Sequence, residues 1–240
     1  YALAASAYKA RYGLGDDAFA PYVMACRNWA SLNPDAFLRK PLSLDDYLAS
    51  RFVVEPIRLF DCAYPLNGAV AFVVSEIEDA TSGLSAPVYL HGMGQGHGAR
   101  SALYALCDGG ETGARSAADR ALAMAGVSHQ DIDICQLYDA FSFSGLYGLE
   151  DFGFCAPGTA PAFVAAGETS PGGRLPVNTG GGHLSGGYLQ GATPLLEAVV
   201  QAREAGGERQ VDRHDLLFVS NSGGCLEYHA TLVVSPHEVL

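Results

Sequence analysis

The sequence is poor in positive charge and has no long apolar run. It carries 14 Lys and Arg against 26 Asp and Glu, for a formal net charge of −12 and a pI near 4.8. An acidic surface of this kind repels nucleic acid and anionic membranes. No apolar stretch reaches the ~20 residues that a bilayer-spanning helix needs. The composition therefore predicts a globular protein with no nucleic-acid or membrane partner.

Paired cysteines are also absent. The six Cys residues are scattered, and no two are spaced as CxxC. Free thiols suit a reducing compartment, and no signal peptide opens the sequence, so we expect a cytoplasmic protein. The glycine-rich segment 91–98, HGMGQGHG, holds His91 and His97 without a supporting carboxylate or Cys. We therefore expect no bound metal.

From residue 87 onward, short β-branched runs alternate with helical patterns. We expect strands at 88–90, 132–137, 216–220 and 230–235, and helices at 116–125, 141–152 and 188–205. Gly126 stands where a left-handed residue would end the first of these helices. Such alternation is typical of an α/β domain with helices on both faces of a sheet.

The first 80 residues follow a different pattern. Residues 1–15 predict a helix, and Ser43 and Asp46 have the spacing of a capping box before another. The run GAVAFVVS, 68–75, predicts a buried strand. The turn-forming segment ATSGLSAP, 80–87, follows it. We accordingly expect two units, residues 1–82 and 83–240.

The segment 178–192, NTGGGHLSGGYLQGA, is dense in glycine and precedes a helical pattern. Such a turn lets backbone N–H groups approach a ligand and places the positive end of a helix dipole beside it. Its spacing resembles the thiolase loop, in which N-x-N-G-G precedes G-H-P-x-G-A. In that frame Tyr188 takes the place of the catalytic His.

Three more stretches resemble thiolases. Residues 116–142 match the region that contains the NEAF or HDCF tetrad, which is Tyr138-Asp139-Ala140-Phe141 in this sequence. Residues 221–228, NSGGCLEY, match the C-x-G-G-G turn. Residues 61–69, DCAYPLNGA, match the pattern D-x-x-x-P-x-x-G-A. The resemblance covers nearly all of the chain. It implies a layered αβαβα thiolase fold. Residues 1–82 would be the loop region and last strand of the N-terminal half, and residues 83–240 the C-terminal half with a mixed five-stranded sheet covered by helices.

The departures from the family's pattern concern its chemistry. Tyr138 replaces the tetrad's Asn or His, Tyr188 the catalytic His, and Asn221 the second Cys. The half that carries the thiolase nucleophile is mostly outside this sequence, and none of the six Cys residues matches the nucleophile's position. A Tyr hydroxyl, with an ordinary pKa of about 10, can donate to a developing enolate or exchange a proton with an alcohol.

This pattern is similar to the thiolase-like acyl-CoA aldolases of steroid side-chain degradation, relatives of the sterol-carrier-protein thiolases. The resemblance implies retro-aldol cleavage of a β-hydroxyacyl-CoA, such as a steroid side-chain thioester, to a ketone and a short acyl-CoA such as propionyl-CoA. The coenzyme A thioester is then the substrate, and no cofactor is bound covalently. The resemblance also implies a homodimer and a small partner with an OB-fold and a zinc ribbon.

Within this frame we expect Tyr188 to be the base or proton relay and Tyr138 its partner or the enolate donor, with the roles exchangeable. The supporting residues would be Asp139, His183 and Asn221, and the substrate-binding backbone would be that of Gly186, Gly187, Gly223 and Gly224. We interpret Cys225 as structural. Two alternatives stay open. One is a degradative thiolase, which is an acyltransferase, and the other is a catalytically silent thiolase-like scaffold subunit. Tyr188 and Asn221 argue against the first, and the retained hydroxyls argue mildly against the second.

Overall fold

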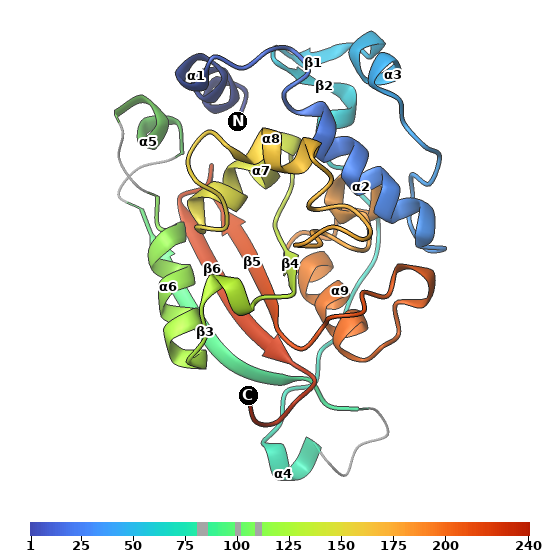
Figure 1. Cartoon of the computed structure of the whole chain (residues 1–240), viewed down its shortest axis with the longest axis vertical. Helices are drawn as coiled ribbons and strands as arrows, with labels where there is room; N and C mark the ends of the chain where they lie inside the picture. The colour runs from blue at the N-terminus through green and yellow to red at the C-terminus, as the bar shows by residue number, and fades with distance from the viewer. Residues whose placement is uncertain (81–85, 99–101, 109–111) are drawn as a thin grey trace.

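The computed structural model describes residues 1–80, 86–98, 102–108 and 112–240 (Figure 1). The helices are α1 (Ala2–Tyr12), α2 (Ala20–Leu32), α3 (Leu44–Ala49), α4 (Ile77–Ala80), α5 (Ala102–Asp108), α6 (Ala114–Ala125), α7 (Ser142–Asp151), α8 (Ala160–Ala165) and α9 (Ala192–Ala202). The strands are β1 (Phe52–Val54), β2 (Ile57–Arg58), β3 (Tyr89–His97), β4 (Ile134–Gln136), β5 (Leu217–Gly223) and β6 (Tyr228–Ser235). Short 3-10 turns η1 (Leu59–Asp61), η2 (His129–Asp131) and η4 (Gly207–Arg209) and one π-helix, η3 (Gly182–Gly186), complete the described elements. No helix among the described residues is long and apolar enough to cross a membrane.

The central sheet is mixed, in the order β3-β6-β5-β4. Strand β6 is antiparallel to β3 and to β5, and β4 is parallel to β5. Alternate side chains face opposite sides of the sheet. Cys135 and Phe218 join a core with α1, α2, α6 and α7, whereas Ile134, Leu217 and Val219 join a second core with α9. Helices therefore cover both faces, as the α/β prediction requires.

The predicted fifth strand of this sheet does not form among the described residues. At the outer edge of β4, Val177 alone makes a parallel bridge with Cys135. The flanking residues explain the short pairing. Pro176 offers a carbonyl but no N–H, and Asn178 turns away with φ 52°. The five-stranded expectation is therefore corrected to four strands and a bridge.

The glycine-rich segment 91–98 is part of strand β3 rather than a loop after a shorter strand. Helix α6 packs directly on its backbone: a Cβ added to Gly94 would lie 2.0 Å from the carbonyl oxygen of Ala117. The glycines thus allow close helix–strand contact. His91 Nε2 lies 2.8 Å from the His237 carbonyl, and the His97 ring packs edge-on to Tyr228.

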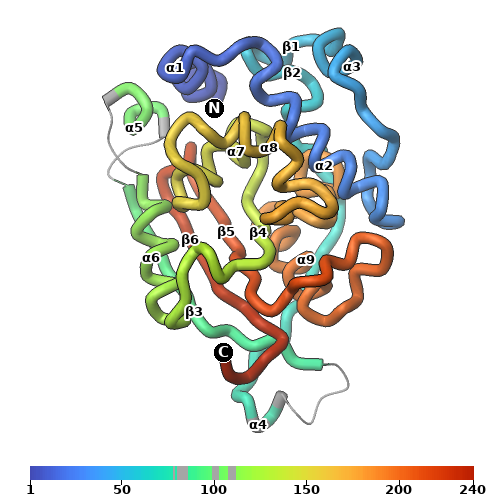
Figure 2. The backbone as a smooth tube through the Cα atoms, in the orientation of Figure 1, coloured from blue at the N-terminus to red at the C-terminus, as the bar shows by residue number. Residues whose placement is uncertain are grey.

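Residues 68–75, predicted as a buried strand, form no strand. Val73 and Val74 are 96% and 91% exposed, and Figure 2 shows the stretch as the cyan tube between β2 and α4. Its β-branched composition suits a strand, but a strand also needs a neighbour for its backbone groups. The prediction is therefore wrong for this structure. The boundary expected in 80–87 falls mostly outside the described residues.

Local signals are reproduced more closely. Ser43 and Asp46 form both bonds of the capping box of α3, and Gly126 ends α6 in the left-handed region with φ 72°. The helix predicted over 188–205 is shorter and begins at Ala192. Residue 188, where we expected the helix to begin, is extended instead, because the backbone of Tyr188 forms hydrogen bonds with residues 64–66.

Candidate active site

The two tyrosines meet beyond the carboxyl end of β4, and Asn221 lies on the neighbouring strand β5. Gln136 pairs with Val219 in the parallel register, so two residues further on Tyr138 and Asn221 lie at the same level. Tyr188 comes from the glycine-dense loop that precedes α9. Carboxyl ends of neighbouring parallel strands commonly carry the functional residues of α/β proteins. Three segments that are distant in sequence thus supply one site.

The hydroxyl groups of Tyr138 and Tyr188 are hydrogen-bonded at 2.8 Å. Their rings are inclined at 69° with centroids 6.2 Å apart. Burial raises the pKa of Tyr138, and the hydrogen bond to Tyr188 raises it further. One hydroxyl donates to the other, so the second hydroxyl keeps its proton available for a ligand. The pair can therefore pass a proton between a substrate and the protein.

His183 lies fully buried beside both tyrosine rings. Its ring centroid is 5.0 Å from that of Tyr138 and 4.9 Å from that of Tyr188, edge-on in each case. Nε2 donates to the carbonyl of Gln190 at 2.7 Å, and Nδ1 accepts the backbone N–H of Asp139 at 3.2 Å. Both ring nitrogens are therefore engaged in bonds to the backbone, and the ring packs against both tyrosines.

The Asp139 carboxylate is fully buried and ties the glycine loop to the end of β4. Its Oδ1 accepts the backbone N–H of His183 at 2.8 Å and lies 3.0 Å from Nδ1 of the same residue. A Cβ on Gly182 would lie 2.3 Å from Oδ2, so only glycine fits against this carboxylate. Asp139 braces the loop from beneath.

Helix α2 supplies a layer below Asp139 that sequence reasoning missed. Tyr22 donates to Oδ2 of Asp139 at 3.4 Å, Cys26 Sγ lies 3.6 Å from the same oxygen, and Asn178 Nδ2 donates to the Tyr22 hydroxyl at 3.0 Å. Burial and the neighbouring carboxylate raise the pKa of both Tyr22 and Cys26. No motif marks Tyr22 or Cys26, because tertiary contact links them to the site, whereas Asn178 belongs to the glycine-dense segment that the motif covers.

The glycine loop closes on itself rather than leaving its N–H groups open. The N–H of Gly186 donates to the Gly181 carbonyl and that of Gly187 to the Gly182 carbonyl, each at 3.1 Å. Gly187 has φ 145°, and a Cβ there would lie 2.2 Å from Leu66 Cδ1. The glycines are thus explained by the turn and its packing, and the expected ligand contacts of Gly186 and Gly187 stay a prediction.

Asn221 and the following turn form the third side of the site. Asn221 Nδ2 donates to the Gly191 carbonyl at 3.2 Å, while its buried Oδ1 has no partner among the described residues. Gly223 closes the β5–β6 hairpin by accepting the N–H of Glu227. Cys225 is half-buried in this turn with a free thiol. One amide oxygen is therefore available to a hydrogen-bond donor.

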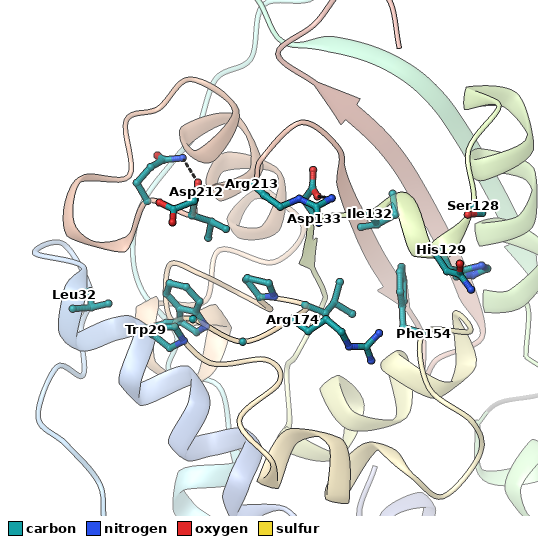
Figure 3. Close-up of a pocket in the computed structure, with 18 of the residues that line it drawn as sticks. Trp29, Leu32, Ser128, His129, Ile132, Asp133, Phe154, Arg174, Asp212 and Arg213 are labelled. Atoms are coloured by element: carbon teal, nitrogen blue, oxygen red, sulfur yellow. Dashed lines mark hydrogen bonds and ion pairs between the residues drawn. The ribbon is translucent and has the colours of Figure 1, made fainter.

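A large cavity of the described residues lies elsewhere (Figure 3). This groove of about 1170 Å³ includes Trp29, Asp133, Arg174 and Arg213 and lies at the amino end of β4. Arg213 is paired with Asp133 at 2.7 Å. A second cavity, of about 420 Å³, lies behind the glycine loop and reaches Asp139 and His183. We place the site by the chemistry of the tyrosine pair, because size alone identifies no reaction. No cluster of three or more potential metal ligands occurs in the described part of the chain.

Comparisons with known proteins place these segments in a family frame. The family model described as "Thiolase C-terminal domain-like" matches residues 96–236. A steroid side-chain-cleaving aldolase of Thermomonospora curvata is 33% identical over 232 residues, which cover 92% of this chain and 58% of that protein. A 17-hydroxy-3-oxo-4-pregnene-20-carboxyl-CoA lyase of Mycobacterium tuberculosis is 35% identical over 195 residues, covering 77% of this chain and 49% of the relative.

One solved structure is similar over the whole chain. It is described as "Ltp2-ChsH2(DUF35) aldolase" and superimposes with a TM-score of 0.85 at 29% identity, covering 100% of this chain and 63% of its own. The chain therefore spans about half to two thirds of the length of these relatives.

Proposed function

The chain belongs to the thiolase C-terminal-domain-like family, and from this premise we propose that the protein cleaves a β-hydroxyacyl-CoA by a retro-aldol reaction. The observation that carries the proposal is the 2.8 Å hydrogen bond between the hydroxyls of Tyr138 and Tyr188. In the thiolase pattern these two positions hold an Asn or His and the catalytic His. Two relatives named as an aldolase and a lyase, and a structural neighbour named as an aldolase, support it.

The proposed reaction needs a proton acceptor for the alcohol and a donor for the enolate. Tyr188 takes the proton of the β-hydroxyl as it passes its own proton to Tyr138 along their hydrogen bond, the Cα–Cβ bond breaks, and the alcohol carbon becomes a ketone. The electron pair moves into the thioester as an enolate, and a proton delivered to Cα completes the short acyl-CoA. The raised pKa of Tyr138 keeps its hydroxyl protonated, which suits donation to the enolate oxygen. We accordingly propose Tyr188 as the base.

The surrounding residues support these two roles. His183 packs against both tyrosine rings, Asp139 braces the loop that carries His183, and Asn221 Oδ1 is free to accept a hydrogen bond from the substrate. A thiolase reaction would instead require an activated thiolate. Tyr188 and Asn221 stand where the thiolase pattern has the activating His and the second Cys. The site therefore favours the aldolase over the acyltransferase alternative.

Several finer points are part of the same proposal. We propose that the substrate is a steroid side-chain thioester, that propionyl-CoA is a product, and that the protein is a cytoplasmic homodimer. The neighbour whose description names a DUF35 component supports a partner protein, for which we propose an OB-fold and a zinc ribbon. We also propose that residues 1–82 hold the loop region and the last strand of an N-terminal half. Val73 and Val74 are exposed in this structure, which supports the proposal that residues 68–75 form a strand only when they pair with a neighbouring strand of that half.

The test uses the full-length protein co-expressed with its partner. It is incubated with a tertiary β-hydroxyacyl-CoA in the absence of free coenzyme A, and acyl-CoA products are followed by mass. Release of a ketone with propionyl-CoA or acetyl-CoA supports aldol cleavage, because thiolysis requires added coenzyme A. Cleavage only of a β-ketoacyl-CoA, and only with free coenzyme A, would restore the thiolase alternative. No turnover of either substrate would favour the scaffold.

Tyr188→Phe supplies the matched variant for this assay. Loss of a general base lowers turnover by about 100-fold or more, while the melting temperature stays nearly unchanged. Tyr64→Phe is the control, because Tyr64 stacks on Phe37 at 4.1 Å and keeps that contact without its hydroxyl. Full activity in Tyr188→Phe would remove this residue from the mechanism.

A further inference from the structure

Tyr1 contacts two of the three segments that form the site. Its hydroxyl donates to the carbonyl of Gly224 at 3.0 Å, in the turn between β5 and β6. Its ring packs against Phe141, with centroids 4.6 Å apart and an interplanar angle of 38°. Phe141 follows Tyr138 by three residues, so Tyr1 connects the segment of the first catalytic tyrosine to the turn that follows Asn221.

The surroundings of Tyr1 keep its hydroxyl a donor. Burial, followed by the nearby Cys225, Tyr188 and Glu227, raises the pKa of Tyr1 to about 12. Tyr1 in turn adds to the raised pKa of Tyr138. The phenol therefore stays protonated through the pH range of an enzyme assay and keeps its bond to the turn. Its hydroxyl is also close enough to both catalytic tyrosines to interact with their charges.

The 223–227 turn is held by contacts from several segments. Gly224 and Leu226 both lie in the left-handed region, with φ 65° and 61°. Elsewhere the turn is held by His229, whose Nε2 lies 3.1 Å from the Leu226 carbonyl, and by Gly98, whose N–H donates to the Glu227 carbonyl at 2.9 Å. The bond from Tyr1 joins the turn to the Tyr138 segment, so we expect its loss to let the turn move relative to that segment.

We infer that Tyr1 is a further positioning residue of this site, which holds the 223–227 turn against the Tyr138 segment so that Asn221 faces the tyrosine pair. The role in turnover rests on the proposed aldolase function. The role in holding the turn rests on geometry alone. Both can be measured, and they can be measured separately.

The first measurement compares Tyr1→Phe with Tyr8→Phe in the full-length protein with its partner. Tyr8 lies on α1, the helix that Tyr1 precedes, and donates to the buried Glu150 Oε1 at 2.6 Å, so its variant loses a comparable bond away from the tyrosine pair. Tyr1→Phe keeps the ring on Phe141 and loses only the bond to the turn. We expect its kcat to fall by about 10-fold, the scale of one hydrogen bond, with a nearly unchanged KM and melting temperature. Tyr8→Phe should lower the melting temperature and leave kcat unchanged.

The second measurement needs no turnover. Cys225 is in the turn, and Cys107 is exposed on α5, so alkylation of both thiols can be followed by peptide mass in one sample. We expect Tyr1→Phe to raise the alkylation rate of Cys225 several-fold relative to Cys107, and Tyr8→Phe to leave the ratio unchanged.

The two readouts separate the inference from the proposed function. A wild-type protein that cleaves no β-hydroxyacyl-CoA refutes the aldolase, while a raised Cys225 rate in Tyr1→Phe still supports the clamp on the turn. An unchanged Cys225 rate overturns the inference whatever the activity. In an active enzyme, a raised rate with an unchanged kcat also overturns it, because the turn would then move without consequence for the reaction.

Discussion

Acidification should lower the free energy of unfolding through one buried residue, His229. It lies on β6 and is 4% exposed. Its Nδ1 is 3.1 Å from Ser222 Oγ, its Nε2 is 3.1 Å from the Leu226 carbonyl, and its ring packs edge-on to Phe152. Burial lowers the pKa of His229 from 6.5 to about 4; the bond to Leu226 opposes this shift and the nearby His97 adds to it.

The sign of the effect follows from where the proton binds. The unfolded chain protonates this histidine near pH 6.5, but the folded chain does so only near pH 4. Between these values the unfolded state binds more protons, so the free energy of unfolding falls as the pH falls. A lowering of this size corresponds to a loss of about 3 kcal/mol, complete below the folded-state pKa and absent above the unfolded-state pKa.

Denaturant unfolding of wild type and His229→Gln across this pH range measures the effect. Asp61 and Glu150 contribute with the opposite sign, because burial raises the pKa of both carboxyl groups. Their contribution is common to the two proteins and cancels in the difference. We expect the wild type to lose about 3 kcal/mol more than the variant on acidification. His237→Gln, at an exposed position, should follow the wild type. Parallel curves for wild type and His229→Gln would refute the reasoning.

Three further substitutions test packing, a buried ion pair and the glycine loop. Gly94→Val should destabilise the protein by about 4 kcal/mol or more in denaturant unfolding, because its Cβ would meet an α6 carbonyl at 2.0 Å. Gly148→Ala, with its nearest atom at 3.7 Å, should change stability by less than about 1 kcal/mol. Glu197→Gln leaves Arg209 without its buried carboxylate partner and should cost about 3 kcal/mol; a double variant with Arg209→Met that recovers nothing would contradict this account. In Gly187→Val the added Cβ would lie 2.2 Å from Leu66 Cδ1, so the Leu66 side chain must move. This change should weaken acyl-CoA binding, measured by calorimetry, by about 10-fold or more. An unchanged affinity would mean that the loop does not lie at the ligand.

The sequence predicts those elements whose signals are local. The capping box at Ser43 and the left-handed Gly126 depend on neighbouring residues, so they can be read without knowledge of the fold. The glycines of β3 are different. In sequence they indicate a loop, and only the proximity of α6 explains why a strand carries them. Residues 68–75 show the converse, because a composition that favours a strand forms none without a neighbour.

The same distinction applies within the site. Tyr138 and Tyr188 could be predicted because a motif fixes their backbone positions, and the structure brings their hydroxyls within 2.8 Å. The supporting residues outside the motifs, Tyr22 and Tyr1, could not be predicted in this way. Tyr22 reaches Asp139 across 117 positions, and Tyr1 reaches Gly224 across 223. Motif spacing thus locates the groups that we propose to react, while tertiary contacts from α1 and α2 hold them in position. A sequence that kept both tyrosines but lost the α1 and α2 contacts would match the motif, and we expect it to bring the hydroxyl pair together less precisely.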